Sequence, residues 1–312
     1  MKTRKQWEDM IGRPIDYTFP HSMTLCKRYS CAEFDGELYQ QANGVRPDGT
    51  VTYQRLFMAF PKDRTGKLPA VAVPFYYPEA TLGFDPETGV ELPGFVLNPT
   101  MLELVRRGYV TATADAYHLT YMESDLDRMD FARWANAGEC LNREHPEWSG
   151  VGKLIADTKL VLDALEGDDR VDPERIGIAG HSLGGKMAFY TGCLDDRIKV
   201  ILASDFGFGW DQTNWNDCWY WGEKLEELKA QGFAHTSLLE AAAPKPFCLL
   251  AGSYDNEESR QMILQAPYYK EHPERAFVVN HATGHRPPQY AKDAGFGFLD
   301  YWLKNDVESE RK

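Results

Sequence analysis

Residues 175–190, "RIGIAGHSLGGKMAFY", place one serine between glycines at the end of an apolar run. The first six residues are typical of a buried strand, and the residues from Leu183 onward are typical of a helix. Residues 180–184, "GHSLG", match the pattern G-x-S-x-G. In a strand–turn–helix setting the glycines permit a sharp turn that projects the serine hydroxyl above a sheet. The stretch therefore predicts that Ser182 is a nucleophile.

Short apolar strands alternate with helical segments on both sides of this stretch. Apolar residues recur at helical spacing over residues 150–167, and residues 99–108 have the same character. Strands of continuous apolar residues between helices indicate an α/β fold, a mostly parallel, doubly wound sheet with helices on both faces. The predicted strands are, in order, residues 23–30, 51–60, 68–77, 109–117, 175–180, 199–206, 246–252 and 276–280.

The chain is predicted to form a single domain over residues 1–312, because no internal repeat or low-complexity linker divides it. Residues 1–60 are expected to be a mostly extended amino-terminal segment. Residues 206–244 form an aromatic insert after the sixth predicted strand. The insert contains Trp210, Trp215 and Trp219, and it follows the carboxyl end of a strand, where such sheets bind their ligands.

Composition excludes several classes of partner. The chain has 312 residues and a net charge of −13, which repels nucleic acid and anionic membrane surfaces. No signal peptide is evident and no run reaches about 18 apolar residues, so a cytoplasmic protein is expected. Its six scattered cysteines are expected to be free thiols. Neither a metal ion nor an organic cofactor is expected.

A nucleophilic serine needs a base that accepts its proton. His285 lies in the loop after the last predicted strand, where its side chain can reach back over the sheet edge. His281 is the alternative, and a structural role at the strand end is expected for it. His285 is therefore the predicted base.

The base needs a carboxylate that fixes its tautomer and stabilises its cation. Asp255 follows the strand at 246–252, and Asp205 follows the strand at 199–206 as the rival candidate. We predict Asp255 as the acid. The resulting chain order is nucleophile, acid, histidine.

Three stretches carry a resemblance to a known superfamily: "VDPERIGIAGHSLGGKMAF", "LLAGSYD" and "TGHRPP". On these residues the chain resembles the α/β-hydrolases, and within them the dienelactone-hydrolase-like and acetyl-xylan-esterase-like branch, over roughly residues 50 to 305. The resemblance implies Ser182 as nucleophile, Asp255 as acid and His285 as base. Dienelactone hydrolases use a cysteine where this chain has Ser182, which disfavours their substrate.

An acyl-transfer site also needs two N–H donors for the developing oxyanion. In this fold one is the amide after the nucleophile, here Leu183, and the other comes from the loop after an earlier strand. That loop is "VAVPFYYPEA", and it lacks the usual His-Gly pair. The amide of Tyr76 is the predicted second donor, with Tyr77 as the alternative.

The expected function is hydrolysis of a carboxylic ester through an acyl-enzyme, on a short-acyl (acetyl) ester of a bulky or carbohydrate alcohol. A prolyl-oligopeptidase-type peptidase or amidase and a catalytically silent binding protein of the same fold are the alternatives. The aromatic insert is expected to contact the substrate; a lid packed on its own domain and an interface in a homo-oligomer are the alternatives for it. The predicted substrate-binding residues are Tyr77, His181, Trp210, Trp215 and Trp219.

Overall fold

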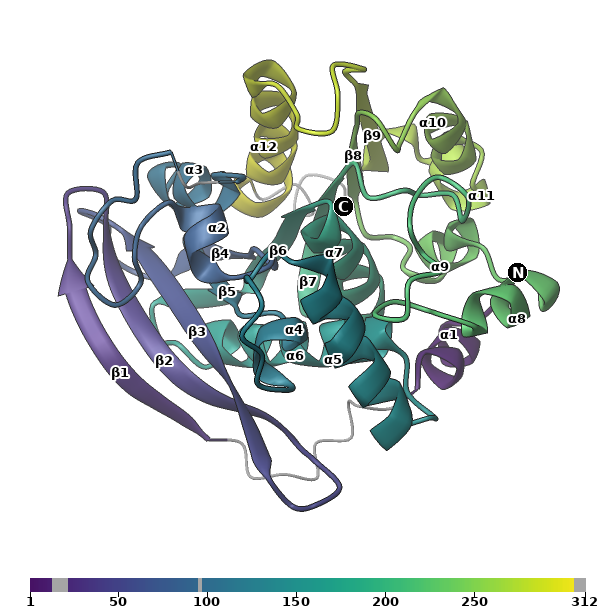
Figure 1. Ribbon diagram of the computed structural model, residues 1–312. Coiled ribbons are helices and arrows are strands. Elements are labelled where there is room, and N and C mark those ends of the chain that lie inside the picture. Colours follow the sequence, from purple (N-terminus) through teal and green to yellow (C-terminus); the bar gives the residue numbers. More distant parts are fainter. Residues whose placement is uncertain (13–21, 95–96, 306–312) are drawn as a thin grey trace.

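The computed structural model describes residues 1–12, 22–94 and 97–305. Within them nine strands form one sheet in the order β1-β2-β3-β5-β4-β6-β7-β8-β9 (Figure 1). The pairs β1–β2, β2–β3 and β3–β5 are antiparallel, and the strands from β5 through β4 and β6 to β9 are parallel. The strands are β1 (Met23–Ser30), β2 (Phe34–Val45), β3 (Val51–Pro61), β4 (Leu68–Ala72), β5 (Val110–Ala114), β6 (Val171–His181), β7 (Ile198–Ser204), β8 (Phe247–Ala251) and β9 (Ala276–Asn280).

Helices cover both faces of the sheet, as the strand–helix alternation predicts. Helices α3 and α12 pack on one face, and α6 and α7 pack on the other, each over a separate apolar cluster. The helices are α1 (Arg4–Ile11), α2 (Pro78–Leu82), α3 (Thr100–Arg106), α4 (Tyr117–Thr120), α5 (Phe131–Glu144), α6 (Gly150–Glu166), α7 (Leu183–Leu194), α8 (Lys224–Ala230), α9 (His235–Ala241), α10 (Glu257–Leu264), α11 (Pro267–Glu271) and α12 (Gln289–Lys304), with a 3₁₀ turn at η1 (Pro273–Arg275).

Residues 4–11 are helical, an exception within the segment 1–60 that was expected to be mostly extended and that contains β1, β2 and most of β3. Thr3 and Gln6 form a capping box at the start of α1, which satisfies amide groups that a helix end leaves without partners. The side chains of Trp7 and Ile11 are fully buried. Helix α1 lies beside α8 and α9, far from β1 in Figure 1. Part of the predicted extended segment, residues 13–21, lies outside the described residues.

Each of the eight predicted strands overlaps a strand of the structure, and β2 is an additional one. Its sequence, "FDGELYQQANGV", mixes glycine, acids and amides and has no apolar run. It is a strand because it pairs along its length with β1 and β3. The aromatic insert therefore follows the seventh strand, β7, rather than the sixth.

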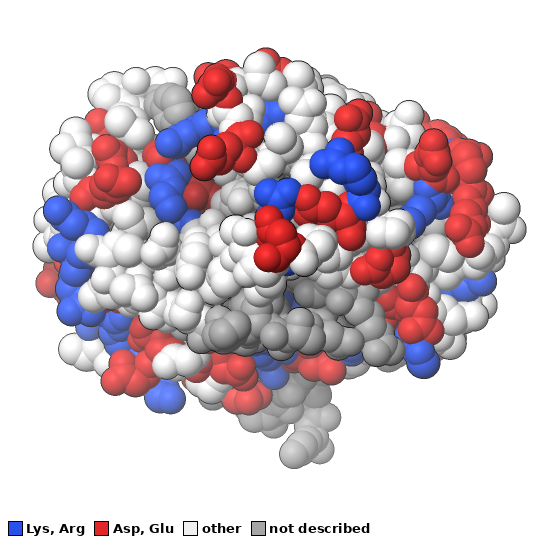
Figure 2. All heavy atoms as spheres, turned by 60° about the horizontal axis from the view of Figure 1, so that its bottom comes forward, with Lys and Arg blue, Asp and Glu red and all other residues white. Residues whose placement is uncertain are grey.

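The charged surface is mixed. Figure 2 shows Asp and Glu side chains spread over one face of the molecule with Lys and Arg between them. Within the described residues, no helix is both long enough and apolar enough to cross a membrane.

Candidate active site

Ser182 occupies a strained turn between β6 and α7. Its φ of +56° and ψ of −118° are sparsely populated for a residue with a Cβ. A Cβ on Gly180 would lie 2.0 Å from the Gly184 carbonyl oxygen, and a Cβ on Gly184 would lie 2.1 Å from the carbonyl oxygen of Pro74. Only glycine fits at both positions. The glycines thus let the chain turn sharply enough to leave Ser182 at the carboxyl end of β6.

His285 lies in the loop between β9 and α12, as predicted, and its ring is fixed by a carboxylate. Its Nδ1 atom lies 2.6 Å from Oδ2 of Asp205. With Nδ1 occupied by this contact, Nε2 is the ring nitrogen left to exchange a proton with a substrate or nucleophile. The ring centroid of His285 lies 4.5 Å from that of His181, the residue before Ser182. The structure therefore brings the predicted base to the same edge of the sheet as the serine.

The carboxylate at His285 belongs to Asp205, not to Asp255, and this corrects the sequence-based assignment. Asp205 follows β7 directly, with an unusual φ of +42°. It is fully buried, and its carboxylate accepts N–H hydrogen bonds from the loop after β8. Burial opposes ionisation, but the hydrogen bonds from His285 and from these amides outweigh it and lower the pKa of Asp205. Asp205 is thus held as an anion against the ring.

Asp255 is also fully buried, but its carboxylate is directed to the backbone of the neighbouring loop. It accepts hydrogen bonds from the amides of Phe206 (2.8 Å), Gly207 (3.0 Å) and Phe208 (2.6 Å), and from the hydroxyl of Ser259 (2.9 Å). Burial raises the pKa of Asp255 despite these donors. The carboxylate of Asp255 thus accepts four hydrogen bonds from groups other than His285.

His281 lies at the end of β9, as expected of a structural side chain. Its Nδ1 atom lies 2.9 Å from the hydroxyl of Thr283, and its side chain is buried. Burial lowers its pKa, although the charge of Asp205 opposes the shift.

The side chain of His181 is buried and lies beside the ring of His285. Its Nδ1 atom lies 3.0 Å from the hydroxyl of Ser204. Burial, together with the neighbouring His285, lowers the pKa of His181 to about 3. The ring is therefore neutral near pH 7 and adds no charge beside His285.

The two predicted oxyanion donors lie on segments that pack against each other. Leu183 is the first residue of α7, so its N–H belongs to the turn that has no intrahelical acceptor. The close approach of Gly184 to Pro74 places the loop after β4 over this first turn. The carbonyl of Tyr76 accepts a hydrogen bond of 3.0 Å from the amide of Ala116, which anchors that loop.

The side chains of the two loop tyrosines pack inward. Burial raises the pKa of Tyr76 to about 12, and its ring packs edge-on against Trp134. Tyr77 is 2% exposed and lies under the guanidinium of Arg128. The predicted contact between the Tyr77 ring and a substrate is therefore not supported by its position.

The tryptophans of the insert belong mainly to the core, which corrects the expectation for Trp215. Trp215 has no exposed surface, and its Nε1 donates to the carbonyl of Gly207. Trp210 is half-buried against Trp7 of α1 and His235 of α9. Trp7 of the amino-terminal helix covers Trp210, and Trp215 packs on Tyr190 and His235, so the alternative of an insert packed on its own domain fits these rings better.

Trp219 retains a small exposed area. It is 9% exposed, and its ring stacks on Phe131 of α5 at a centroid distance of 6.1 Å and an interplanar angle of 9°. The ring of Phe131 is itself exposed. Among the predicted insert contacts, Trp219 and Trp210 keep accessible surface.

Lys186 is a buried cation close to the site that the sequence did not single out. It lies one turn after Ser182 on α7, and its amine donates to Asn214 Oδ1 at 3.1 Å and lies 4.7 Å from the centre of the Trp215 ring. Burial lowers its pKa to about 7, against the opposing effect of Asp255 and other acids. The one signal in the sequence is a lysine within an otherwise apolar, buried helix.

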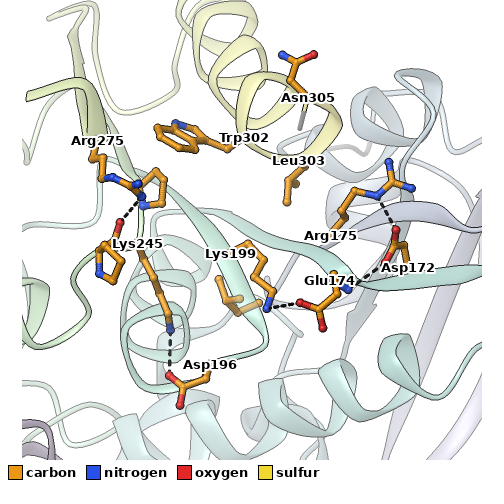
Figure 3. Close-up of a pocket in the computed structure, with 13 residues that line it drawn as sticks. Asp172, Glu174, Arg175, Asp196, Lys199, Lys245, Arg275, Trp302, Leu303 and Asn305 are labelled. Atoms are coloured by element: carbon orange, nitrogen blue, oxygen red, sulfur yellow. Dashed lines mark hydrogen bonds and ion pairs between the residues drawn. The ribbon is translucent and has the colours of Figure 1, made fainter. Parts of the chain in front are cut away.

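A cavity of about 740 Å³ lies at the opposite end of the strands from Ser182, near the starts of β6, β7 and β8 (Figure 3). It is remote from Ser182, which follows the end of β6. Each of its basic side chains has a partner in the protein: Arg175 pairs with Asp172, Lys199 with Glu174, Lys245 with Asp196, and Arg275 donates to the Pro244 carbonyl. Within the described residues, no group of three or more His, Cys, Asp and Glu side chains is placed to hold a metal ion.

A strained serine after a parallel strand, with a histidine and a buried carboxylate after later strands, defines the architecture of the α/β-hydrolases. The chain has this fold. The solved structure of a glucuronoyl esterase from Solibacter usitatus superposes with a TM-score of 0.67 over 93% of this chain and 88% of that chain, at 14% identity. An acetyl xylan esterase from Paenibacillus sp. R4 superposes with a TM-score of 0.55 over 93% and 91%, also at 14% identity.

Sequence comparison matches smaller parts of the chain. Residues 150–238 match the family described as glucuronyl esterase, fungi. The protein YtaP of Bacillus subtilis (strain 168) is 29% identical in an alignment of 165 residues that covers 49% of this chain. The match spans 54% of the length of YtaP, so this chain corresponds to about half of that relative.

Proposed function

We propose that this protein is a serine hydrolase that cleaves carboxylic esters, with Ser182 as nucleophile, His285 as base and Asp205 as acid. The observation that carries the proposal is the 2.6 Å contact between His285 Nδ1 and the buried Asp205 carboxylate. This contact lies at the carboxyl ends of the parallel strands, where Ser182 has a strained conformation. A strained serine, together with a histidine held by a buried carboxylate after neighbouring strands, is typical of a catalytic site.

The reaction follows from the roles of these groups. His285 Nε2 accepts the hydroxyl proton as the Ser182 oxygen attacks the ester carbonyl, and Asp205 stabilises the resulting imidazolium. The amides of Leu183 and Tyr76 donate to the oxyanion of the tetrahedral intermediate. His285 returns the proton to the departing alcohol, and a water molecule, activated by the same ring, then releases the acid from Ser182.

The proposed substrate is an ester of a carbohydrate. The structural neighbours and the matched family are named for esterases of this kind. Acetyl esters of a sugar alcohol are the first candidate, in line with the sequence-based expectation. Esters in which a sugar acid is the acyl group are the second, because the family match over residues 150–238 contains Ser182 and most of the insert.

The nucleophile is tested with a fluorophosphonate probe. The native protein should be labelled at Ser182, whereas Ser182→Ala should not be labelled and His285→Ala should be labelled slowly, because only a serine activated by a base attacks the probe readily. Peptide mapping identifies the modified residue. Equal labelling of native protein and Ser182→Ala would show that another residue reacts with the probe and would overturn the assignment, whereas a native protein that is not labelled would favour a silent binding protein.

The substrate class is tested with a panel. Rates are compared for p-nitrophenyl acetate, p-nitrophenyl octanoate, an acetylated xylo-oligosaccharide, a methyl ester of glucuronic acid and a peptide p-nitroanilide. Preference for the acetylated sugar supports the first candidate, and preference for the uronate ester supports the second. A higher kcat/KM on the anilide than on all four esters would favour a peptidase.

A further inference from the structure

Two neighbouring loops at the active-site edge bind each other through buried carboxylates. Residues 205–208 follow β7 and residues 252–255 follow β8, and these two strands are parallel neighbours in the sheet. The carboxylate of Asp205 accepts hydrogen bonds from the second loop, and that of Asp255 accepts hydrogen bonds from the first. The donors to Asp205 are the amides of Gly252, Ser253, Tyr254 and Asp255 at 2.9–3.0 Å, and the donors to Asp255 are the amides of Phe206, Gly207 and Phe208 at 2.6–3.0 Å.

The two carboxylates differ in their other partner. Asp205 contacts His285, whereas Asp255 contacts the hydroxyl of Ser259 on α10. Both carboxylates are fully buried. Because a buried carboxylate is costly unless donors surround it, each loop depends on the other for its conformation.

The backbone at Asp205 needs such support. Its φ of +42° is unfavourable for a residue with a side chain and persists only where the surroundings impose it. The three amides that follow Asp205 directly are the ones that Asp255 binds. If they were released, the chain at Asp205 would be free to return to a common conformation, and the Oδ2 atom would move away from the His285 ring.

We propose that Asp255 is a positioning residue of the active site: its carboxylate binds the amides of residues 206–208 and thereby holds Asp205 in contact with His285. This inference rests on the proposed function for its effect on catalysis. It assigns Asp255 no contact with the substrate and no proton transfer.

A double-mutant cycle tests the proposal. Asp255→Asn replaces an oxygen that faces backbone N–H groups with an N–H₂ group, so one or more of the amide contacts is lost. Since a misplacement of about 1 Å can cost ~100-fold in rate, kcat should fall ~10- to 100-fold while KM stays within about twofold. Asp205→Asn should lower kcat ~10⁴-fold, because the ring loses its anionic partner.

The double variant Asp205→Asn/Asp255→Asn shows whether Asp255 acts through Asp205 or independently of it. If Asp255 acts through Asp205, its replacement should cost little further once Asp205 is gone, and the double variant should match Asp205→Asn within about threefold. A fully additive loss, or an Asp255→Asn enzyme with native kcat, would overturn the proposal. If Asp255→Asn does not fold, Asp255→Ser is taken through the same cycle, since it leaves room for water against the three amides.

The proton on Nδ1 of His285 gives a readout that is independent of turnover. Its low-field NMR signal should be present in the native protein, absent in Asp205→Asn, and weakened or shifted in Asp255→Asn. The matched control, Ser259→Ala, removes one donor and leaves the three amides, so it should keep the signal and the rate near native. A native-like signal in Asp255→Asn would overturn the positioning role even if no ester proved to be a substrate, whereas loss of the signal without any esterase activity would leave it standing and refute the proposed function alone.

Discussion

At the scale of single residues, the two histidines after β9 show how little separates the proposed catalytic side chain from a structural one. His285 and His281 are four positions apart, yet one contacts a buried carboxylate and the other the hydroxyl of Thr283. We predict that His285→Ala lowers kcat ~10⁴- to 10⁶-fold, as expected when one member of a triad is removed. His281→Ala should retain activity within about tenfold. Initial rates on the best ester of the panel measure both, and a larger loss in His281→Ala would reverse the assignment of the base.

The turn at Ser182 provides a second prediction at this scale. Gly184→Ala places a methyl group 2.1 Å from the carbonyl oxygen of Pro74, so the loop that supplies Tyr76 must move. We expect kcat to fall at least ~100-fold, the cost of losing one oxyanion donor. The matched control is Gly297→Ala in α12, where the added methyl group meets no atom within 4 Å. That control should keep full activity and gain about 0.5–1 kcal/mol of stability in thermal unfolding.

The sequence did not predict which aspartate contacts His285. Two aspartates follow two adjacent parallel strands, and either could reach a histidine from the next strand. The choice depends on how the two loops interlock through their amides, and no local pattern encodes that arrangement. The turn at Ser182 was easier to predict, because the glycines that it requires lie within five consecutive residues.

At the scale of elements, helix α1 fixes the aromatic insert. Trp7 donates to the hydroxyl of Ser237 and packs edge-on against Phe233 at 4.8 Å. Trp7→Ala should lower the free energy of unfolding by ~3–5 kcal/mol, the usual cost of deleting a buried tryptophan side chain. Lys5→Ala, on the exposed face of the same helix, should change it by less than about 0.5 kcal/mol. Urea denaturation measures both, and equal stabilities would show that α1 does not anchor the insert.

The antiparallel strands are joined to the parallel part of the sheet by a buried acid. Glu37 of β2 contacts Arg28 of β1 and Arg170, just before β6. Although burial favours the neutral acid, hydrogen bonds from Arg170 and Tyr39 lower the pKa of Glu37 from 4.5 to about 2. A lowered pKa means that the stabilisation is complete above pH 4.5 and is lost as the pH falls towards 2.

Glu37→Gln should therefore be less stable than the native protein at pH 7, and the difference should shrink between pH 4.5 and pH 2. Urea denaturation at several pH values measures the difference. Replacement of the exposed Glu87 by glutamine is the control and should show no such trend. A difference independent of pH would mean that the ion pairs of Glu37 do not stabilise the sheet.

Helices and strands with a clear apolar period were predictable, and elements that depend on distant partners were not. Strand β2 has no apolar run and is defined by its two neighbours in the sheet. The sequence gives no sign that Trp7, at the start of the chain, packs against Trp210 and Phe233 of the insert. Contacts between residues that are far apart in the sequence override the local sequence pattern.

At the scale of the whole molecule, the reactivity of the six cysteines measures how far the protein is folded. Cys26 is exposed, whereas Cys140, Cys193 and Cys248 are buried, and burial raises the pKa of Cys193 to about 12. The thiolate is the form that attacks a thiol reagent, so Cys26 should react first in the native protein and the buried thiols only as the protein unfolds. In denaturant without reductant all six should react. Fewer than six would reveal a disulfide that the structure does not contain among its described residues.

The exposed edge strand at the antiparallel end of the sheet affects whether copies of the molecule aggregate. Strand β1 ends the sheet, and nearly all of its residues are exposed, including the apolar side chains of Met23 and Leu25. A long flat strand in this position would be a template for aggregation through strand pairing. The register of β1 shifts between Leu25 and Lys27, and Lys27 and Arg28 follow at once. An irregular edge that carries the charge of Lys27, beside an Arg28 already paired with Glu37, is a poor template for an identical edge, so solubility at high concentration should depend on these few residues.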